Sequence, residues 1–303
     1  MKEIEVFVFS YNRGKYLRNC IDSIRRHVPS SRVTVVDDAS TDPETCKVLE
    51  DISGHTTVVK RSKMLGIYGG YWNNMQYTID ELSQSDWAVF IEDDMQFIRP
   101  VLQEDLERIE LFFDKFPKSG YLALEFMKEE LRDRDYETVS IDESVPVYFF
   151  RDEAEAYRGT IYCSNIGAVN IKYMRSIKYR LGEDEKQTRE KAKIAFDKMG
   201  FYPYPLLMFL PFSEAVKNSK RTLVRRLVEK WYKAGFYPYR DLSEAKLVEL
   251  LERDLSVLPI TGDYLTTKNT PPQHSYVYKD SMKRCNGVIR RLEKLERLIR
   301  HLE

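Results

Sequence analysis

Hydrophobic and polar positions alternate in blocks over the first third of the chain. Short apolar runs rich in β-branched and aromatic residues predict strands at 4–10, 32–38, 56–60 and 87–91. Between these runs apolar residues recur every three or four positions, which predicts helices at 15–27, 40–52 and 66–82. Strands and helices alternating at this pace indicate right-handed βαβ units and a mostly parallel sheet.

The pattern is less regular after residue 100. A helix is predicted at 102–116 and another at 186–199, and the strand-like segments are 120–126, 145–150, 159–171 and 200–210. The charged stretch 128–146 is expected to be an irregular surface excursion. From residue 213 the composition shifts to charged helices at 214–234 and 243–255, a proline-containing loop at 256–278 and a long helix from about residue 280.

This shift predicts two parts, a catalytic domain at 1–212 and a mainly helical extension at 213–303. The extension either packs on the core or mediates oligomerisation. Its basic amphipathic segment 216–233 suits an anionic lipid surface, and equally a solvated surface helix. In the last helix an a/d seam favours a homodimer through residues 280–303 or docking on the parent domain. The seam residues are Cys285, Val288, Leu292, Leu295, Ile299 and Leu302.

Composition narrows the class of protein. The 303 residues contain 48 Lys plus Arg and 48 Asp plus Glu, and this balance argues against a generic nucleic-acid binder. The four cysteines form no CxxC pair, which favours a reduced, intracellular protein. The N-terminus reads as a first strand, and no apolar run is long enough to span a membrane. We therefore expect a cytoplasmic protein, with peripheral membrane contact left open.

Acidic and polar residues follow three of the predicted strands, as "SYN", "DDAS" and "EDD". Ligands of open α/β sheets bind beyond the carboxyl ends of the strands, so these residues are expected to meet at one rim. Carboxylates clustered in this way suit Mg²⁺ or Mn²⁺. An extended backbone would align Glu92 with Asp94, whereas a turn would present Asp93 and Asp94 together.

Four motifs occur in order: "VFVFSYNRGKYLRNCIDSIRRH", "VTVVDDASTD", "GIYGGYWNNM" and "AVFIEDDMQF". Together they resemble the N-terminal half of a family 2 glycosyltransferase. The resemblance is good over residues 4–97, weaker over 160–210, and does not reach the last 90 residues. It implies an α/β fold of the GT-A (Rossmann-like) class, a mixed and mostly parallel sheet flanked by helices, with a helical C-terminal extension. It also implies a metal-dependent, inverting enzyme that moves a sugar from a nucleotide diphosphate sugar, expected to be UDP-linked, to a hydroxyl acceptor.

The resemblance assigns roles to particular positions. Asp38 matches the acid that pairs with the imide of a uracil-type base, and "EDD" matches the DxD-like element, in which Asp94 is expected to bind Mn²⁺ or Mg²⁺. Glu92 and His274 are further candidate ligands of the metal. The nucleotide-site candidates are Ser10, Tyr11, Asn12, Arg13, Asp37, Asp38, Lys63, Gly66, Asn74, Glu92 and Asp93.

Several of these residues also have purely structural interpretations. Asn12 fits an Asx-turn, Asp37 and Asp38 fit a turn or a helix cap, and Gly66 fits a tight turn. Enzymes of this family often place a basic side chain near the base or the phosphates, around the third strand. In this sequence Lys60, Arg61 and Lys63 are the candidates, and the resemblance does not single out one of them.

The second half contains a candidate general base. The segment "LGEDEKQTREKAKIAF" resembles the family's "ED" element, and an inverting transfer needs a carboxylate that accepts the proton of the acceptor hydroxyl. Asp184 is the expected base and Glu183 the reserve, although acids are common in first helical turns. Ser164, Asn165 and Gly167 in "CSNIG" are acceptor-side candidates, and an ordinary turn explains them equally well.

Two other classes of function stay open. A nucleotidyltransferase would need a Gly-rich phosphate loop bearing Lys or Arg after the first strand, and "SYNRGKYL" matches this poorly. A non-catalytic sugar-nucleotide-binding or assembly module would be built around the tail helices. The sequence leaves the acceptor open among a glycan, a lipid-linked sugar and a modified nucleic acid.

Overall fold

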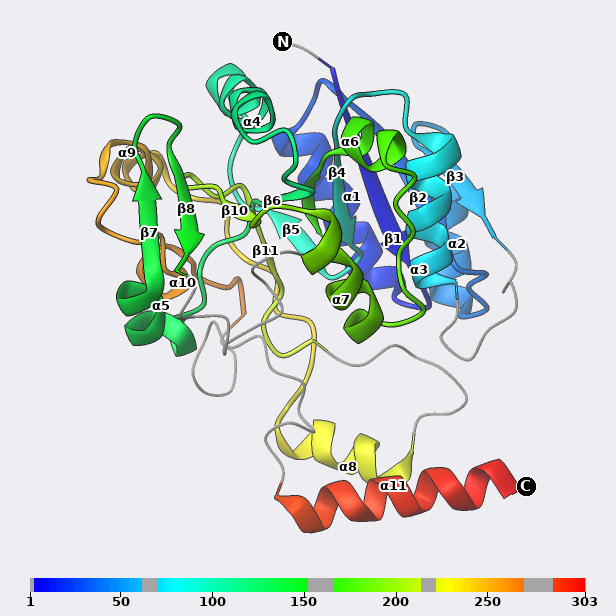
Figure 1. Ribbon diagram of the computed structural model, residues 1–303. Coiled ribbons are helices and arrows are strands. Elements are labelled where there is room, and N and C mark those ends of the chain that lie inside the picture. The colour runs from blue at the N-terminus through cyan, green and yellow to red at the C-terminus, as the bar shows by residue number, and fades with distance from the viewer. Residues whose placement is uncertain (1–2, 62–69, 152–165, 214–221, 270–285, 303) are drawn as a thin grey trace.

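The computed structural model describes residues 3–61, 70–151, 166–213, 222–269 and 286–302. These residues form a nine-stranded sheet, a small two-stranded sheet and the helices around them (Figure 1). The order of the large sheet is β3-β2-β1-β4-β9-β6-β10-β8-β7. No helix among the described residues is both long and apolar enough to cross a membrane.

The first half of the sheet is parallel. β1 lies between β2 and β4, and β3 pairs with the outer edge of β2. The bounds of these strands are β1 Ile4–Ser10, β2 Ser31–Asp37, β3 Thr57–Lys60 and β4 Ala88–Glu92. They agree closely with the strands predicted from the apolar runs.

The second half of the sheet is mixed. β9 runs antiparallel between β4 and β6, β10 is parallel to β6, and β8 is antiparallel to both β10 and β7. In the described part of the chain, only β9 and β8 therefore oppose the common direction of the sheet. The bounds are β6 Tyr121–Ala123, β7 Val139–Asp142, β8 Val147–Phe150, β9 Gly167–Val169 and β10 Gly200–Phe201.

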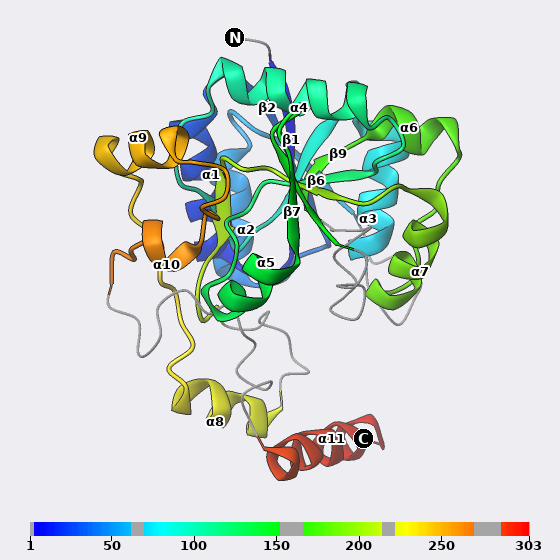
Figure 2. The same ribbon diagram turned by 60° about the vertical axis from the view of Figure 1, so that its left-hand side comes forward.

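Helices cover both faces of this sheet. Figure 2 shows α1 and α2 on one side of the strands and α3, α6 and α7 on the other. The bounds are α1 Gly14–His27, α2 Pro43–Ile52, α3 Tyr71–Tyr77, α4 Gln103–Lys115, α6 Ile171–Ser176 and α7 Glu185–Ala195. A π-helical turn, η1 Thr78–Leu82, continues α3.

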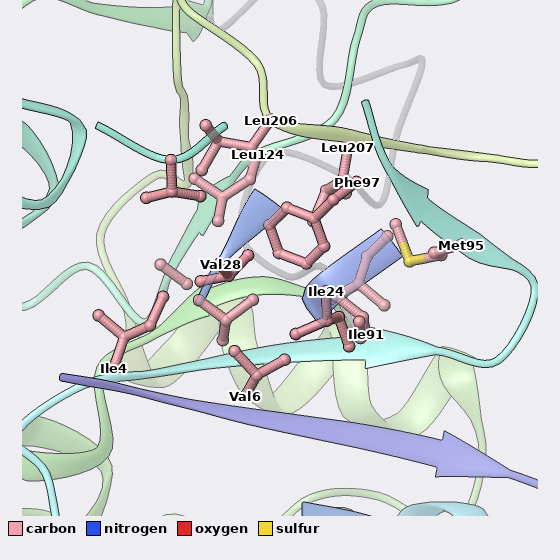
Figure 3. Packing of buried hydrophobic residues seen from close by; sticks show 14 of the residues in the cluster. Ile4, Val6, Ile24, Val28, Ile91, Met95, Phe97, Leu124, Leu206 and Leu207 are labelled. Atoms are coloured by element: carbon pink, nitrogen blue, oxygen red, sulfur yellow. The ribbon is translucent and has the colours of Figure 1, made fainter. Parts of the chain in front are cut away.

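Alternation along β1 explains the two layers of core. Val6 and Val8 pack in one hydrophobic cluster with α1, α2 and α4, whereas Phe7 and Phe9 pack in another with α3, α6 and α7. Figure 3 shows part of the first cluster, where Val6 of β1 lies near Ile24 of α1 and near Val28. A strand buried on both faces has to be apolar almost throughout, as the first run is.

The segment after β4 forms one strand of a second, smaller sheet. β5 Met95–Phe97 pairs antiparallel with β11 Leu207–Phe209. Residues 236–265 pack on this region, because Tyr239, Leu250 and Tyr264 share a buried cluster with Tyr16 of α1. This stretch holds α9 Glu244–Glu252 and α10 Thr261–Tyr264, and the proposed division at residue 212 stays a prediction.

Three local predictions differ from the structure. The stretch 128–146 is not irregular: it holds a short 3₁₀ turn, η2 Glu129–Leu131, then α5 Arg132–Thr138 and β7. The helix predicted to reach residue 199 ends at Ala195, because Phe196 turns to an extended backbone and packs against Tyr121 and Tyr179. The loop predicted at 256–278 contains α10, and its residues from 270 on lie outside the described part.

Two helices complete the described chain, α8 Leu223–Trp231 and α11 Gly287–Leu302. They lie side by side, apart from the large sheet in both views (Figures 1 and 2). α8 falls within the predicted basic helix and α11 within the predicted last helix. Cys285, the first residue of the predicted seam, lies outside the described residues.

Glu5 is an acid inside β1 with only 3% of its surface exposed. It accepts hydrogen bonds from Ser83 Oγ at 2.5 Å and from the Gln84 and Ser85 N–H groups, and it forms an ion pair with Arg32. Burial alone would raise the pKa of Glu5, but these donors and Arg32 together hold the pKa below its usual value.

We expect Glu5→Gln to lower the free energy of unfolding by about 2 kcal/mol at pH 7, because an ionised acceptor of several hydrogen bonds is lost. The native pKa of Glu5 lies below the unfolded one, so this contribution is present above about pH 4.3 and is lost as the pH falls through the lowered native value. Urea unfolding from pH 7 to pH 3 measures it. Glu143→Gln, at an exposed position, is the control, and equal losses in both variants would contradict the assignment.

Candidate active site

The polar ends of β1, β2 and β4 meet at one rim. Ser10 stands opposite Asp37 in the parallel register, and Phe9 stands opposite Glu92. Asp37 in turn stands opposite Lys60 at the end of β3. The convergence expected from the three polar motifs is therefore present in the structure.

Asp93 connects this rim. It is buried, and its carboxylate accepts hydrogen bonds from Ser10 Oγ and from the Tyr11 N–H, both at 3.2 Å. The Asp93 N–H donates to the Phe9 carbonyl at 3.1 Å. Asp93 thus holds the turn that follows β4 against the turn that follows β1.

Arg13 is the basic residue that pairs with the acids after β4. Its Nη1 lies 2.7 Å from Asp94 Oδ2 and 3.4 Å from Asp93 Oδ1. Asp94 is completely buried, and Arg13 is the one side-chain partner of its carboxylate among the described residues, so that Oδ1 has none. Residues 93–94 form a turn, so Asp93 and Asp94 are presented together. This was the second of the two alternatives left open by the sequence.

Glu92, at the end of β4, has a protein partner. Its Oε1 accepts a hydrogen bond from the Tyr71 hydroxyl at 2.6 Å. Burial, reinforced by the charge of Asp94, raises the pKa of Glu92 to about 7 despite the Tyr71 bond. Burial likewise raises the pKa of Asp93 to about 7, against the opposing effect of Arg13. The negative charge at this rim is therefore only partly compensated by the protein.

Asn12 and Asp37 mainly shape the loops. The Asn12 side-chain oxygen accepts the Thr41 and Asp42 N–H groups at 2.8 and 2.9 Å, which ties the turn after β1 to the start of α2. Asn12 itself has a φ of 51°, a left-handed conformation that asparagine tolerates. Asp37 accepts both the N–H and the hydroxyl of Ser40. The Asp37 contacts match the turn suggested for it, whereas the Asn12 bonds join two loops that are distant in the sequence and are not those of an Asx-turn.

Asp38 lies where β2 faces the start of α3. Its Oδ2 accepts the Gly70 N–H at 3.0 Å, and its own N–H donates to the Ser10 carbonyl at 2.9 Å. A Cβ at Gly70 would lie 1.8 Å from Asp38 Oδ1, so only glycine permits this approach. Asn74 is buried one turn into the same helix.

The three basic candidates near β3 differ in their surroundings. Lys60 stands beside Asp37, where its charge acts to lower the pKa of that acid against the larger effect of burial. The Arg61 guanidinium lies 3.9 Å from the centre of the Tyr77 ring. Lys63 lies outside the described residues, as does Gly66.

Asp184 caps the N-terminus of α7. Its Oδ1 accepts the Gln187 N–H at 2.7 Å, so it is a helix cap whatever else it does. Glu183, before it, is exposed. The segment leading to Asp184 joins the helix that begins at the rim, because the Leu181 N–H donates to Gln76 Oε1 of α3.

The acceptor-side candidates are only partly described. Gly167 begins β9 with a φ of 103°, and a Cβ there would lie 2.5 Å from the Leu122 carbonyl oxygen. Its glycine is therefore required by sheet packing. Ser164 and Asn165 lie outside the described residues.

The residues described here bring together no group of three or more His, Cys, Asp or Glu side chains suited to a metal ion. His274, one of the three candidate ligands, lies outside them. Asp94 nevertheless fits a hard cation, because its buried Oδ1 has no partner among the described groups and Oδ2 has only Arg13. Glu92, water or a bound diphosphate would supply further oxygen ligands.

Two contributors to the site were not singled out from the sequence. Tyr71 bonds Glu92, and Ser40 bonds both Asp37 and the Asn12 N–H. Tyr71 follows the glycines of "GGYW", and an aromatic residue in that helix entry was the available signal. Ser40 stands at the start of the segment predicted as a helix, but α2 begins later and Asp42 caps it.

A mixed sheet with polar side chains at the carboxyl end of β1 and carboxylates at those of β2 and β4 fits a domain of the predicted GT-A class. Residues 5–139 match the family described as Glycosyl transferase family 2. This part of the chain is similar to that family, and the protein is a glycosyltransferase. The fold class and the enzyme class expected from the motifs are thereby confirmed.

Similarity to solved structures is broad but low in identity. TarS 1–349 of S. aureus is 17% identical with a TM-score of 0.46, over 83% of this chain and 69% of that one. The longer TarS structure is 18% identical with a TM-score of 0.47, over 83% of this chain but only 42% of that one. The mannosyltransferase PcManGT of Pyrobaculum calidifontis, in complex with GDP-Man and Mn²⁺, is 14% identical with a TM-score of 0.44, over 76% of this chain and 63% of that one.

Sequence identities and TM-scores this low do not identify the donor, the metal or the acceptor of this protein. No curated protein sequence matches the chain.

We expect Arg13→Ala to lower the free energy of unfolding by about 3 kcal/mol, because two buried carboxylates lose their guanidinium partner. Mn²⁺ should raise the melting temperature of this variant more than that of the wild type, since a divalent cation replaces the missing charge. Differential scanning fluorimetry with and without Mn²⁺ measures both effects.

Arg18→Ala is the matched control. It removes a nearby arginine, inside α1, whose partner, Asp51, is half exposed, so the loss should stay below about 1 kcal/mol. An Arg13→Ala variant as stable as Arg18→Ala, with no added response to Mn²⁺, would refute the charge balance described for the rim.

Proposed function

We propose that this chain is a metal-dependent, inverting glycosyltransferase that moves a sugar from a UDP-linked donor to a hydroxyl acceptor. The observation that carries the proposal is the excess of buried negative charge where β1, β2 and β4 end. Glu92, Asp93 and Asp94 stand against the one described guanidinium of Arg13. A nucleotide diphosphate with its cation is the ligand that such a rim suits.

Asp94 is the residue that would hold Mn²⁺ or Mg²⁺, with Glu92 beside it. Its complete burial, with Arg13 as the one side-chain partner of its carboxylate among the described residues, supports this role. When bound, the cation supplies positive charge that stabilises the departing diphosphate. Arg13 stabilises Asp93 and Asp94 and thereby keeps the turn after β4 in place.

Asp38 is the residue that would recognise the base. A carboxylate accepts the imide N–H of uracil, and Asp38 is held at the mouth of the rim by the Gly70 N–H. Ser10 and Tyr11 contribute the adjoining wall through their bonds to Asp93. The nucleotide would thus lie across the ends of β1 and β2.

Asp184 would act as the general base. It accepts the proton of the acceptor hydroxyl while the acceptor oxygen bonds to the anomeric carbon and the bond to the diphosphate oxygen breaks. Attack from the side opposite the leaving group inverts that carbon.

Gly70→Ala tests the placement of Asp38. The added Cβ must displace the Asp38 carboxylate, which is the end of a flexible side chain, so folding should change little. The affinity for UDP, measured by calorimetry, should fall at least tenfold. Gly54→Ala adds the same methyl group where no atom lies within 4 Å and should leave UDP affinity unchanged. Unaltered affinity in Gly70→Ala would remove Asp38 from the nucleotide site.

Asp184→Asn tests the base, because asparagine caps a helix as well as aspartate does. We expect turnover of the preferred donor, found in a panel of UDP, GDP and dTDP sugars, to fall by about 10³-fold with donor affinity unchanged. Glu183→Gln is the adjacent control and should retain activity, whereas Asp94→Asn should lose metal-dependent donor binding.

Three results would count against the proposal. If no sugar nucleotide binds with Mn²⁺ or Mg²⁺, the proposed donor class is wrong. Donor binding that is unchanged in Asp94→Asn would remove the metal assignment alone. Full turnover in Asp184→Asn would remove the base alone.

A further inference from the structure

α8 and α11 form an antiparallel pair of helices. The side chain of Glu296, in the second half of α11, accepts the N–H groups of Leu223 and Val224 at the start of α8. Near the other end, Val228 is buried against Val224, Tyr232 and Ile289, and Ile289 belongs to the first turn of α11. Figures 1 and 2 show the two helices side by side.

Each helix carries an apolar stripe that this pairing leaves exposed. On α8 the stripe is Leu223, Leu227 and Trp231, with Trp231 83% exposed. On α11 it is Val288, Leu292, Leu295 and Ile299, each at least half exposed. We call the seven residues together the apolar face.

The two stripes lie on the same side of the pair. On α8 each stripe residue precedes a contact residue by one position, as Leu227 precedes Val228. On α11 the same holds, as Val288 precedes Ile289 and Leu295 precedes Glu296. One position is about 100° of rotation, and in antiparallel helices the same rotation from the contact leads to the same side. The stripes therefore form one continuous surface.

Basic and acidic side chains of the helix pair also differ in exposure. Apart from Gly287, every exposed side chain among the described residues of α8 and α11 is apolar or basic. The exposed basic residues are Arg226 and Lys230 on α8 and Arg290, Arg291 and Lys294 on α11. The acids of the same described residues, Glu229, Glu293 and Glu296, are turned inward and are buried or half-buried.

We infer that the apolar face binds an anionic lipid surface. Apolar side chains with an exposed tryptophan enter the interface of a bilayer, while the flanking lysine and arginine residues meet anionic headgroups. A second copy of the chain suits the face poorly. A symmetric dimer through it would bring the basic residues of one copy toward those of the other, with no exposed acid on the described parts of either helix to neutralise them.

This surface is linked to the candidate active site. Just after α8, the Gly235 N–H donates to the Phe212 carbonyl and the Gly235 carbonyl accepts the Tyr16 hydroxyl, both at 2.9 Å. Tyr16 lies in the first turn of α1, and the Arg13 guanidinium carbon is 5.7 Å from the centre of its ring. A membrane bound through the helix pair is therefore attached close to the rim where the donor would bind.

Vesicle flotation with the full chain tests the inference. We expect binding to vesicles of phosphatidylcholine mixed with phosphatidylglycerol, and at least tenfold weaker binding to phosphatidylcholine alone or at about 1 M salt, where charges are screened within about 3 Å. Leu227→Ser with Leu295→Ser should weaken binding at least tenfold, and so should Lys230→Glu with Arg291→Glu. All four positions are exposed, so the fold should persist, which circular dichroism checks.

Arg25→Glu with Lys118→Glu is the matched control. It makes the same change in net charge at two exposed positions elsewhere and should bind as the wild type does. Brominated lipids should quench tryptophan fluorescence in the wild type, and Trp231→Phe should abolish that quenching. Failure to bind anionic vesicles, or weakening by the control equal to that of the Lys230 and Arg291 variant, overturns the inference. So does a wild-type dimer in light scattering that Leu227→Ser with Leu295→Ser converts to a monomer.

Discussion

The bonds of Asp93 to the turn after β1 are the constraint on which the rest of the site depends. Ser10 and Tyr11 each donate a hydrogen bond to this one carboxylate, and Arg13 stands beside it. These contacts fix the end of β4 against the end of β1. They also fix Asp94, because it is the next residue in the same turn and shares Arg13.

A second set of bonds extends this order to β2. Asn12 ties the first turn to residues 41 and 42, Ser40 ties Asp37 to the same loop, and Asp38 reaches the start of α3 through Gly70. The loops therefore hold one another, and the side chains at the strand ends are positioned before any ligand arrives. Such preorganisation favours binding, because less conformational entropy is lost when the ligand is held.

The sequence predicted the parallel half of the sheet well for a physical reason. β1 and β4 are buried on both faces, so most of their residues are apolar and the pattern shows where each strand begins and ends. The convergence of acids followed from topology alone. Two pairings could not be predicted, because side-chain packing joins segments that are distant in the sequence. Arg13 and Asp94 are about 80 positions apart, and Tyr71 and Glu92 are about 20 apart.

The same reasoning explains why α5 and β7 were missed. The stretch from 128 to 142 is mostly charged, and β7 is an edge strand with only Val139 buried, so period-two alternation is weak there. Asp184 shows the limit of local signals in another way. An acid that opens a helix is explained by capping alone, and only a measured reaction separates a cap from a base.

The rim and the helix pair differ in which charges they bury. At the rim, carboxylates are buried with less positive charge than they need, so a cation and a diphosphate would complete the site. On the helix pair the arrangement is reversed, since acids are turned inward and basic residues outward. The two surfaces therefore suit ligands of opposite charge, a cation at the rim and anionic headgroups at the helix pair. Tyr16 lies between them, bonded to Gly235 on one side and near Arg13 on the other, so the ligands that complete the two surfaces would be held close to one another.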